Sequence, residues 1–559
     1  MPPTDGADAV VSGPEPREGM SAVRGERVWP GWGILRRWRP LVAATLVSGV
    51  VAFVLLRHSA GPGVYLVRDF VAVPQPAAPR TWFPDSAAQL RAWPLDAVSW
   101  ALSPVLTPGA QQLLMLVGVV VLTGSGVGAL LTRAGTTAAV VGAAVAVWNP
   151  YVTERLLLGQ APTLLGYAAL PWIVVALRWQ ARLRWRLLAL ACAAAPAALT
   201  PWGSVAAAVV AVVAALVVKH SRGRPAGRSV LWVSLIALLW CLPWLIPALA
   251  LRGAAADPAG AAAFALGDDT GFGPWVSGLL GGGTWSAAAV PPSRSSAGAV
   301  AASALLLTTA VVALAALVPL TRRRRWAAGA LLVGPATVAA VLSGPLASTY
   351  AAAQQVPGLA LVRDQHRLLG VALLTESVLV GLLVGEVARR WSWRVLPGVA
   401  GVILAATLVT VPDLPALVAQ TYRPSTYPSA WETVTRTIDT LPPGSTVASF
   451  PWQPLRRTPW GQTGAFLDPT PRAVTTPVVT SSVLTVPRGI RDVVVRDPGV
   501  AENPAWATGE VTGASLRAAG VTHVLYWRTS PGEPPRDRQG WVVLAEAPDF
   551  VLWKVPHAG

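Results

Sequence analysis

Long apolar runs, separated by short polar segments, fill most of the first 411 residues of the chain. About eleven runs approach 20 residues, the length of a helix that crosses a hydrocarbon core of about 30 Å. They are Leu41–Leu56, Gln111–Leu131, Ala134–Trp148, Pro162–Leu177, Leu187–Leu199, Gly203–Val218, Val230–Leu249, Ala297–Val318, Trp326–Leu342, Leu368–Val387 and Val395–Val411. Pro196 and Pro201 interrupt the stretch from residue 187 to 218, so it forms either two short spans or one kinked span. The pattern predicts a mostly α, polytopic membrane helix bundle.

Polar sequence flanks this region on both sides. Residues 1–35 are rich in Pro, Gly and charge and have no apolar period, which predicts a disordered tail. Residues 413–559 mix helical and strand patterns and predict an α/β domain. The predicted elements are a helix at Trp431–Leu441, strands at Thr446–Phe450 and Val521–Trp527, a helix that ends at Leu516–Gly520, and a hairpin of Trp541–Ala545 and Phe550–Val555. The stretch Asp468–Pro504 has no assignable pattern. Residues 36–412 form the predicted transmembrane domain.

Charge indicates the orientation of the chain. The net charge is +17, but the region from Thr421 onward holds 13 basic and 11 acidic residues, a net charge of +2, so the remaining +15 lies before it. Alternate connections between the apolar runs are basic and contain no Asp or Glu. They include Arg133, Arg178–Arg186, Lys219–Arg228, Arg322–Arg325 and Arg389–Arg394. By the positive-inside rule these connections are cytoplasmic, which predicts a cytoplasmic N-terminus and an extracytoplasmic C-terminal domain. The positive charge therefore reports topology and predicts no nucleic-acid partner.

Composition excludes several classes of protein. The chain of 559 residues is 53% hydrophobic and 13% charged, with a mean hydropathy of +0.51, which is too apolar for a soluble protein. Cys192 and Cys241 both lie in apolar runs, so the predicted exterior part has no thiol for a disulfide or a Cys-ligated metal site. The sequence has no phosphate-binding Walker loop, dinucleotide fingerprint or metalloprotease helix. It also has no clear half-to-half repeat with interrupted helices, the signature of many secondary transporters.

Three polar patches stand out at the ends of apolar runs. Asp69 lies in Tyr65–Phe70 after the first run, Glu154 and Arg155 lie in Trp148–Leu156, and Arg363–Arg367 precedes a late run. Charged groups at the edge of a helical bundle are costly and often face a functional water-filled cavity. The alternatives are solvated loop charges at Asp69, a local ion pair at Glu154 and Arg155, and a juxtamembrane cap at Arg363–Arg367.

These patches, together with Gly159-Gln160, Gly166–Trp172 and Leu516–Leu525, resemble the GT-C class of glycosyltransferases. The nearest likeness is to arabinofuranosyltransferase-type multi-spanning proteins of actinobacteria. It covers most of the chain in architecture but only short patches in sequence. The resemblance implies an inverting transfer of sugar from a polyprenyl-phosphate donor to an envelope glycan or glycolipid acceptor, at the cell membrane and outside the cytoplasm. The partners it implies are therefore that donor, that acceptor and the lipid bilayer.

The resemblance also implies roles for individual residues. Asp69 would be the catalytic base that accepts the acceptor proton. Arg363 and Arg367 would bind the donor phosphate, since guanidinium forks match its oxygens. The remaining candidates would line the cavity or orient these groups: Arg68, Glu154, Arg155, Asp364 and His366. The class often pairs acids in the first loop, whereas Asp69 follows Arg68 and the next acids are the distant Asp85 and Asp96. The ligand spacing thus supports no metal, although it leaves a divalent cation open, and we expect no other cofactor.

Two other functions remain open from the sequence. The same cations could bind phosphate in a transporter or flippase of a lipid-linked envelope precursor, or the chain could be a non-catalytic membrane assembly protein. Asp268-Asp269 and His523 and His557 are expected to be solvated or surface groups without a metal.

Overall fold

A computed structural model provides the fold. It describes residues 30–79, 90, 92–220, 227–250, 256–317, 320–356, 359–391, 394–462, 464–489, 491–496 and 503–556. The chain forms two units, Met1–Trp38 and Arg39–Gly559, and the site lies in the second. Most of the predicted N-terminal tail lies outside the described residues, as do Asp85 and His557. The first helix begins at Pro30, within the stretch predicted as the tail.

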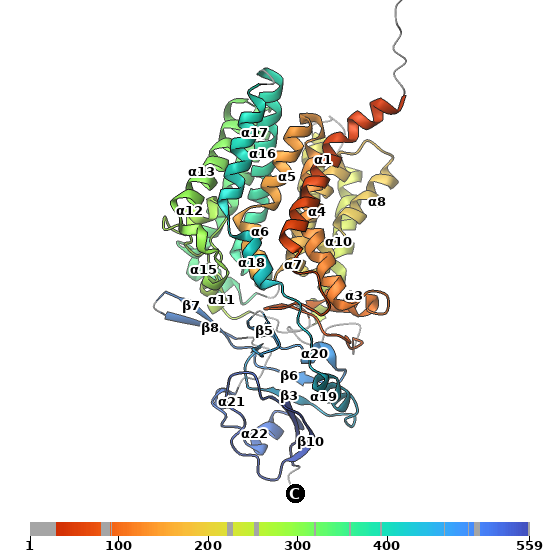
Figure 1. Cartoon of the computed structure of the whole chain (residues 1–559), viewed down its shortest axis with the longest axis vertical. Coiled ribbons are helices and arrows are strands. Elements are labelled where there is room, and N and C mark those ends of the chain that lie inside the picture. The colour runs from red at the N-terminus through yellow and green to blue at the C-terminus, as the bar shows by residue number, and fades with distance from the viewer. Residues whose placement is uncertain are drawn as a thin grey trace, which may run out of the picture. The chain divides into compact units, whose positions relative to one another are not determined.

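Helices make up most of the described chain before residue 422 (Figure 1). They are α1 (Pro30–Leu56), α3 (Leu95–Leu102), α4 (Pro108–Leu130), α5 (Thr136–Val147), α6 (Pro150–Leu157), α7 (Ala161–Arg178), α8 (Leu183–Ala194), α9 (Pro201–His220), α10 (Gly227–Ala250), α11 (Ala259–Ala263), α12 (Pro274–Leu279), α13 (Ala297–Val312), α14 (Arg322–Ser343), α15 (Ala347–Ala353), α16 (Leu369–Arg390), α17 (Leu396–Thr410) and α18 (Leu414–Thr421). Short turns include η2 (Ala197–Leu199), η4 (Pro292–Ser295) and η7 (Gln365–Leu368), and the strands β1 (Leu66–Val67) and β2 (Phe70–Val71) form a small hairpin after α1.

The predicted count of about eleven membrane spans is not confirmed. Among the described residues, seven helices are long and apolar enough to cross a membrane, and the bent pair of α17 and α18 would make an eighth. A helix lies in each of the eleven predicted runs, but α5 and α8 have 12 residues each. At 1.5 Å per residue each is about 18 Å long, well short of a hydrocarbon core of about 30 Å. The stretch from residue 187 to 218 contains two helices, α8 and α9, separated by η2 at Pro196 and Pro201.

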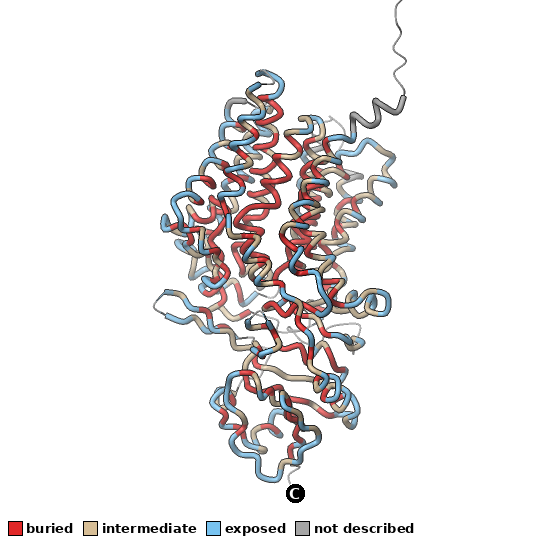
Figure 2. The backbone as a smooth tube through the Cα atoms, in the orientation of Figure 1, coloured by how far each residue is buried: buried red, intermediate tan, exposed pale blue. Residues whose placement is uncertain are grey.

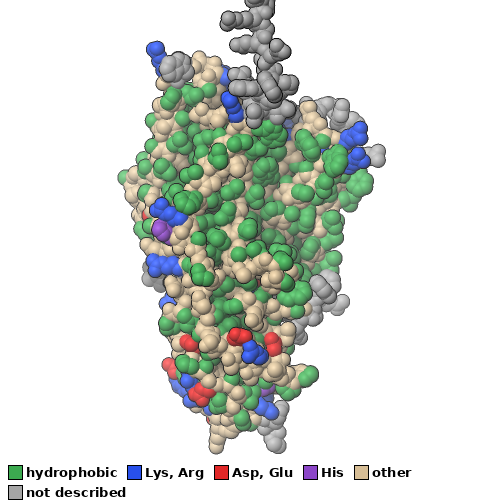
Figure 3. All heavy atoms as spheres, turned by 45° about the vertical axis from the view of Figure 1, so that its right-hand side comes forward, with side chains coloured by type: hydrophobic (Ala, Val, Ile, Leu, Met, Phe, Trp, Pro, Cys, Tyr) green, Lys and Arg blue, Asp and Glu red, His purple; other side chains and the backbone are tan. Residues whose placement is uncertain are grey.

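Apolar surface and small residues shape the bundle. In Figure 3 hydrophobic side chains cover much of the helical part of the molecule, and most of the acidic side chains in view lie toward its lower end. Inside, buried residues follow α5 and α16 (Figure 2). A Cβ added at Gly142 would lie 3.1 Å from the Ser377 carbonyl oxygen, and one at Gly385 would lie 2.7 Å from the Ala134 carbonyl oxygen. The two helices are therefore antiparallel and in close backbone contact, as glycine permits.

The C-terminal region contains a five-stranded mixed sheet in the order β10-β11-β9-β3-β6. Its strands are β3 (Val447–Phe450), β6 (Val478–Val479), β9 (His523–Trp527), β10 (Val542–Glu546) and β11 (Phe550–Lys554), and its main helices are α19 (Ser429–Asp439) and α22 (Gly513–Ala518). Strand β3 is parallel to β6 and β9, whereas β9, β11 and β10 are antiparallel. The helices and strands predicted outside Asp468–Pro504 are all present within a few residues of their predicted bounds.

Side chains of this sheet alternate between two apolar cores. On one face Leu525 and Leu552 pack with Trp431 of α19, and on the other Val524 and Val551 pack with a second cluster that includes α22. The stretch without an assignable pattern contains α20 (Thr470–Ala473), β7 (Leu484–Arg488), β8 (Arg491–Val495) and, at its end, the start of α21 (Pro504–Ala507); before it lie β4 (Leu455–Arg456) and β5 (Phe466–Leu467). The prediction of a surface His523 was wrong, because this side chain is buried in β9.

Candidate functional site

Asp69 lies at the tip of the β1–β2 hairpin. Val67 pairs with Phe70, so Arg68 and Asp69 form a two-residue turn. Arg68 has a φ of 48°, in the left-handed region, and such strained turns persist where the surroundings fix them. Its N–H donates to the Ala465 carbonyl (3.1 Å), and its carbonyl accepts from the Leu467 N–H (2.8 Å). Asp69 is exposed.

Two elements of the bundle hold the hairpin in place. The Gln112 amide of α4 accepts from the Tyr65 N–H (2.8 Å) and donates to the Tyr65 carbonyl (3.0 Å). Gly159, in the turn between α6 and α7, has a φ of 69°, and a Cβ there would lie 2.2 Å from the Val67 carbonyl oxygen. The hairpin thus rests directly on the backbone of that turn.

The break between α5 and α6 directs the side chains of Glu154 and Arg155 into the protein. Asn149 caps α6 by accepting from the Val152 N–H (3.0 Å), and Pro150 takes the first helical position, where no backbone donor is needed. The α6 helix is therefore set off from α5, and its side chains at positions 154 and 155 are fully buried.

Arg155 and Arg367 share one carboxylate. The Arg155 guanidinium contacts both Asp364 oxygens, at 2.5 and 2.8 Å, and Arg367 Nε lies 3.2 Å from Asp364 Oδ2. Burial alone would raise the pKa of Asp364, but the guanidinium groups of Arg155 and Arg367 and the ring of His366 together outweigh burial and hold that pKa well below its usual range. The trio of Arg155, Arg367 and Asp364 carries a net charge of +1. Only Arg367 of the three is appreciably exposed, at 21% of its side chain, against 0% and 5% for the others.

His366 and Glu154 extend this group inward. Arg155 donates to His366 Nδ1 (2.8 Å), so the proton of a neutral imidazole sits on Nε2. That Nε2 lies 3.1 Å from Glu154 Oε2, outside hydrogen-bonding geometry. Glu154 Oε2 accepts from the Thr284 N–H (3.0 Å). The pKa of Glu154 is raised well above its ordinary value, first by burial and then by the nearby Asp269 carboxyl.

A second buried ion pair closes the network. Arg294 Nε donates to Asp269 Oδ2 (2.8 Å), and both side chains are buried. Arg294 also donates to Ser303 (3.0 Å). Asp268, by contrast, is exposed and accepts from the Gly271 and Gly273 N–H groups of its own loop. The prediction of a solvated Asp269 was therefore wrong.

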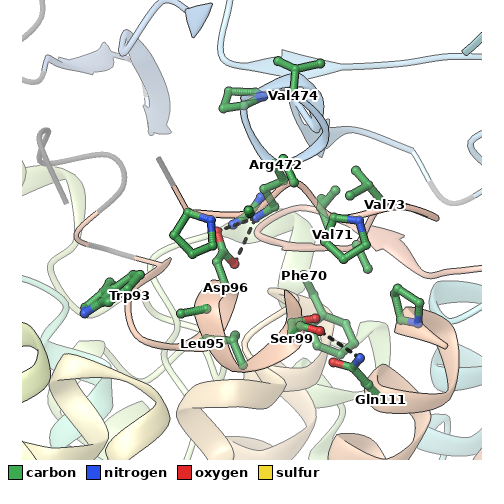
Figure 4. A pocket seen from close by; sticks show the side chains of 18 of the residues that line it. Phe70, Val71, Val73, Trp93, Leu95, Asp96, Ser99, Gln111, Arg472 and Val474 are labelled. Carbon is green, nitrogen blue, oxygen red and sulfur yellow. Dashed lines mark hydrogen bonds and ion pairs between the residues drawn. The ribbon is translucent and has the colours of Figure 1, made fainter. Parts of the chain in front are cut away.

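A cavity opens beside the hairpin (Figure 4). Its volume is about 160 Å³, and its walls come from the first loop, α3, α4, and the segment around α20. Asp69 and Gln111 line it, as do Asp96 and Arg472, which form an ion pair at 3.0 Å between α3 and α20. Asp69 is also near enough to Arg367 for their opposite charges to interact. The exposed acid thus lines the cavity and lies near Arg367 of the cationic group.

The structure brings most of the predicted site residues into one region. Arg155, Asp364, His366 and Arg367 contact one another or share partners, Glu154 adjoins His366, and Arg68 and Asp69 lie in the neighbouring hairpin. Arg363 has a different neighbour: its guanidinium stacks over Phe264, 4.7 Å from the ring centroid, and it is not among the described residues that line the cavity. Glu154 and Arg155 lie inside the protein and face other protein groups.

Sequence reasoning missed three residues of this region, Arg294, Gln111 and Arg472, and wrongly placed Asp269 in solvent. Arg294 could have been noticed in the sequence, because it is the sole Lys or Arg between residues 253 and 321 and lies in the same segment as the acid pair Asp268-Asp269. Gln111 and Arg472 could not have been noticed in the sequence, since they line the cavity only because distant segments fold together. The described residues include no group of three or more His, Cys, Asp or Glu that could hold a metal ion.

Comparisons with known proteins identify the fold. No family model and no curated protein matches the sequence. A solved structure of arabinofuranosyltransferase AftD from mycobacteria matches 94% of this chain and 40% of its own, at 16% identity and a TM-score of 0.59. A variant of the same enzyme matches 94% of this chain and 42% of its own, at 15% identity and a TM-score of 0.56. This chain spans less than half the length of those proteins. The predicted resemblance to a GT-C arabinofuranosyltransferase is confirmed at the level of the fold, which is that of a multi-pass membrane protein.

Proposed function

We propose that this chain is an envelope glycosyltransferase that transfers a sugar from a polyprenyl-phosphate donor to an extracytoplasmic glycan or lipid acceptor. The observation that carries the proposal is the fold of a mycobacterial arabinofuranosyltransferase, matched along 94% of the chain. The position of Asp69, exposed beside a cavity and close to the charge of Arg367, agrees with it.

In the proposed reaction Asp69 takes the proton of an acceptor hydroxyl, and the hydroxyl oxygen attacks the anomeric carbon of the donor. The bond between that carbon and the phosphate oxygen breaks, and polyprenyl phosphate leaves with the electron pair. The attack comes from the side opposite the leaving group, so the anomeric configuration inverts. Arg367 compensates the charge that develops on the phosphate, because its own carboxylate is shared with Arg155. The proposal assigns no step to a metal ion.

We place the site outside the cytoplasm because of the residues that pack at the two ends of α16. Ala134, next to the basic connection at Arg133, lies against Gly385 near the basic C-terminal end of α16. At the opposite end of α16, Gly370 lies against Tyr151 of α6, beside the buried network. The network is thus remote from the basic end, which the positive-inside rule assigns to the cytoplasm. Labelling single cysteines placed at exposed positions of the C-terminal region in intact cells tests this orientation.

The transfer is tested with the full chain reconstituted in liposomes. Labelled polyprenyl-phosphate arabinose is supplied first, followed by other polyprenyl-phosphate sugars, each with cell-envelope glycan as acceptor. The proposal expects a glycosidic product from the wild type and a loss of product of at least about 100-fold in Asp69→Asn, the usual range for a general base. Asp492→Asn, an exposed carboxylate of β8, is the matched control and should retain activity. Movement of donor across the bilayer without any glycosidic product would instead identify a flippase.

A further inference from the structure

Four consecutive arginines, Arg322–Arg325, lie at the start of α14, and we call them the arginine patch. Arg322, Arg323 and Arg324 are exposed, and their side chains have no ion pair or hydrogen bond with the residues that the structure describes. The sequence offers no counter-charge nearby, because it contains no Asp or Glu between residues 269 and 364. These cations also adjoin the positive end of the helix dipole, where positive side chains are unfavourable. The patch is therefore a concentration of positive charge that an anion would relieve.

More positive charge lies at the same end of the bundle. Ser343, at the end of α14, donates to Gln365 of η7, directly before α16. The two helices have 22 residues each and run antiparallel, so the start of α14 is level with the end of α16. There Arg389 and Arg390 pair with Glu386 and leave a net charge of +1. At the upper end of the helical part in Figure 3 the charged side chains in view are basic. The positive-inside rule assigns this end to the cytoplasm.

The helix that carries the patch exposes much of its apolar surface. Only 17% of the apolar window of α14 is buried inside the described protein, the lowest share among the seven helices that could cross a membrane. Trp326 follows the patch directly and is 71% exposed, as is typical of tryptophan at a membrane interface. Further exposed apolar side chains continue along the helix at Leu331, Val333, Val338 and Val341. In a bilayer the patch therefore lies at the level of the headgroups, beside a helix surface that contacts acyl chains.

We propose that the arginine patch binds the headgroups of anionic phospholipids in the leaflet at this end of the bundle. Guanidinium forks match the oxygens of a phosphate group, and the exposed side of α14 can pack against the acyl chains of the same lipid. A zwitterionic headgroup has the same phosphate but also brings a cation, and an inorganic phosphate has no chains. The inference does not rest on the proposed glycosyl transfer, because the patch and the candidate site lie at opposite ends of α14.

The test measures lipid binding to the full chain, purified in neutral detergent micelles, by native mass spectrometry. The probes are phosphatidylglycerol and phosphatidylcholine with the same acyl chains, and inorganic phosphate is added as a competitor. A triple variant removes the three unpartnered charges of the patch: Arg322→Gln, Arg323→Gln and Arg324→Gln. The matched control loses the same charge from three exposed arginines of the C-terminal region: Arg423→Gln, Arg457→Gln and Arg491→Gln.

We expect the wild type to bind phosphatidylglycerol at least about tenfold more tightly than phosphatidylcholine, because each arginine near an anionic headgroup contributes about fivefold in affinity. The triple variant should lose this preference, and the matched control should keep it. The inference is overturned if the wild type shows no preference or if the triple variant retains it. An equal loss in the matched control would attribute the preference to overall charge and also overturn the inference. Displacement of phosphatidylglycerol by an equal concentration of inorganic phosphate would do the same, because it would identify a site for free anions.

Discussion

Replacement of Asp364 by asparagine tests the buried cationic group most directly. The change keeps the size of the side chain but removes the one negative charge that Arg155 and Arg367 share. Arg155 is fully buried and Asp364 is 5% exposed, so water cannot replace the lost charge. Removal of one partner from a buried ion pair costs about 3–5 kcal/mol, because the other charge stays buried without compensation. That is a large share of a typical folding free energy of about 5–15 kcal/mol.

The assay is a denaturant titration of the purified protein in mixed micelles, followed by tryptophan fluorescence, in comparison with two other variants. Glu432→Gln removes the carboxylate of an exposed ion pair with Arg436 on α19, where side chains are 56% and 69% exposed. Such a pair contributes about 0.3–0.5 kcal/mol, so this control should unfold almost like the wild type. The double variant Arg155→Met with Asp364→Leu removes both charges and should recover much of the stability that Asp364→Asn loses.

The result for the double variant distinguishes a charge effect from simple damage to packing. If Asp364→Asn lost no more stability than Glu432→Gln, Asp364 would not be compensating buried charge, and the buried network would be refuted. Equal losses in Asp364→Asn and in the double variant would attribute the effect to packing instead.

Three further predictions concern the hairpin and the C-terminal region. Gly159→Ala should lower the unfolding free energy by about 1–3 kcal/mol, because its Cβ would meet the Val67 carbonyl and its φ is positive; a denaturant titration checks this, and a loss below about 0.5 kcal/mol would refute the close contact. Gln112→Leu leaves both backbone groups of Tyr65 without partners and should cost about 2–3 kcal/mol and most of the transfer activity, so full activity would show that Gln112 does not position the hairpin. Burial opposes ionisation of Asp468, but the buried Arg456 guanidinium lowers the pKa of this carboxyl. The stability that the ionised Asp468 contributes should therefore be intact above its unfolded pKa of about 3.9 and be lost as the pH falls below that value. Fluorescence-monitored unfolding midpoints for the wild type and Asp468→Asn should converge only below that pH.

Hydropathy predicted where the helices lie better than how many cross the membrane. Each apolar run became a helix, because twenty apolar residues in lipid must satisfy their backbone groups internally. Apolar composition alone cannot separate a spanning helix from a short buried one. In α5, 9 of 12 residues are buried against neighbouring helices, so its apolar character reflects packing inside the bundle. That distinction depends on contacts with α16, far away in the sequence.

The pairing of Arg155 with Asp364 shows what local sequence could predict about the site. Both patches were recognisable as charge at the ends of apolar runs, and they meet although 209 residues separate them. Their burial was not predictable, because it depends on the helices and loops that enclose them. The same holds for Asp96 and Arg472, 376 residues apart, neither of which is unusual in its own segment. Asp269 looked like a loop acid because its partner, Arg294, lies 25 residues away.

Residues on both sides of the predicted division after residue 412 contact the hairpin and line the cavity. The structure is one unit from Arg39 to Gly559. The turn that presents Asp69 is completed by Arg68, whose N–H and carbonyl both bond to the chain around β5. Arg472 closes one wall of the cavity through Asp96. Since the hairpin is bonded on one side to the bundle and on the other to this region, the position of the proposed base depends on both. The C-terminal region therefore helps to position the proposed base.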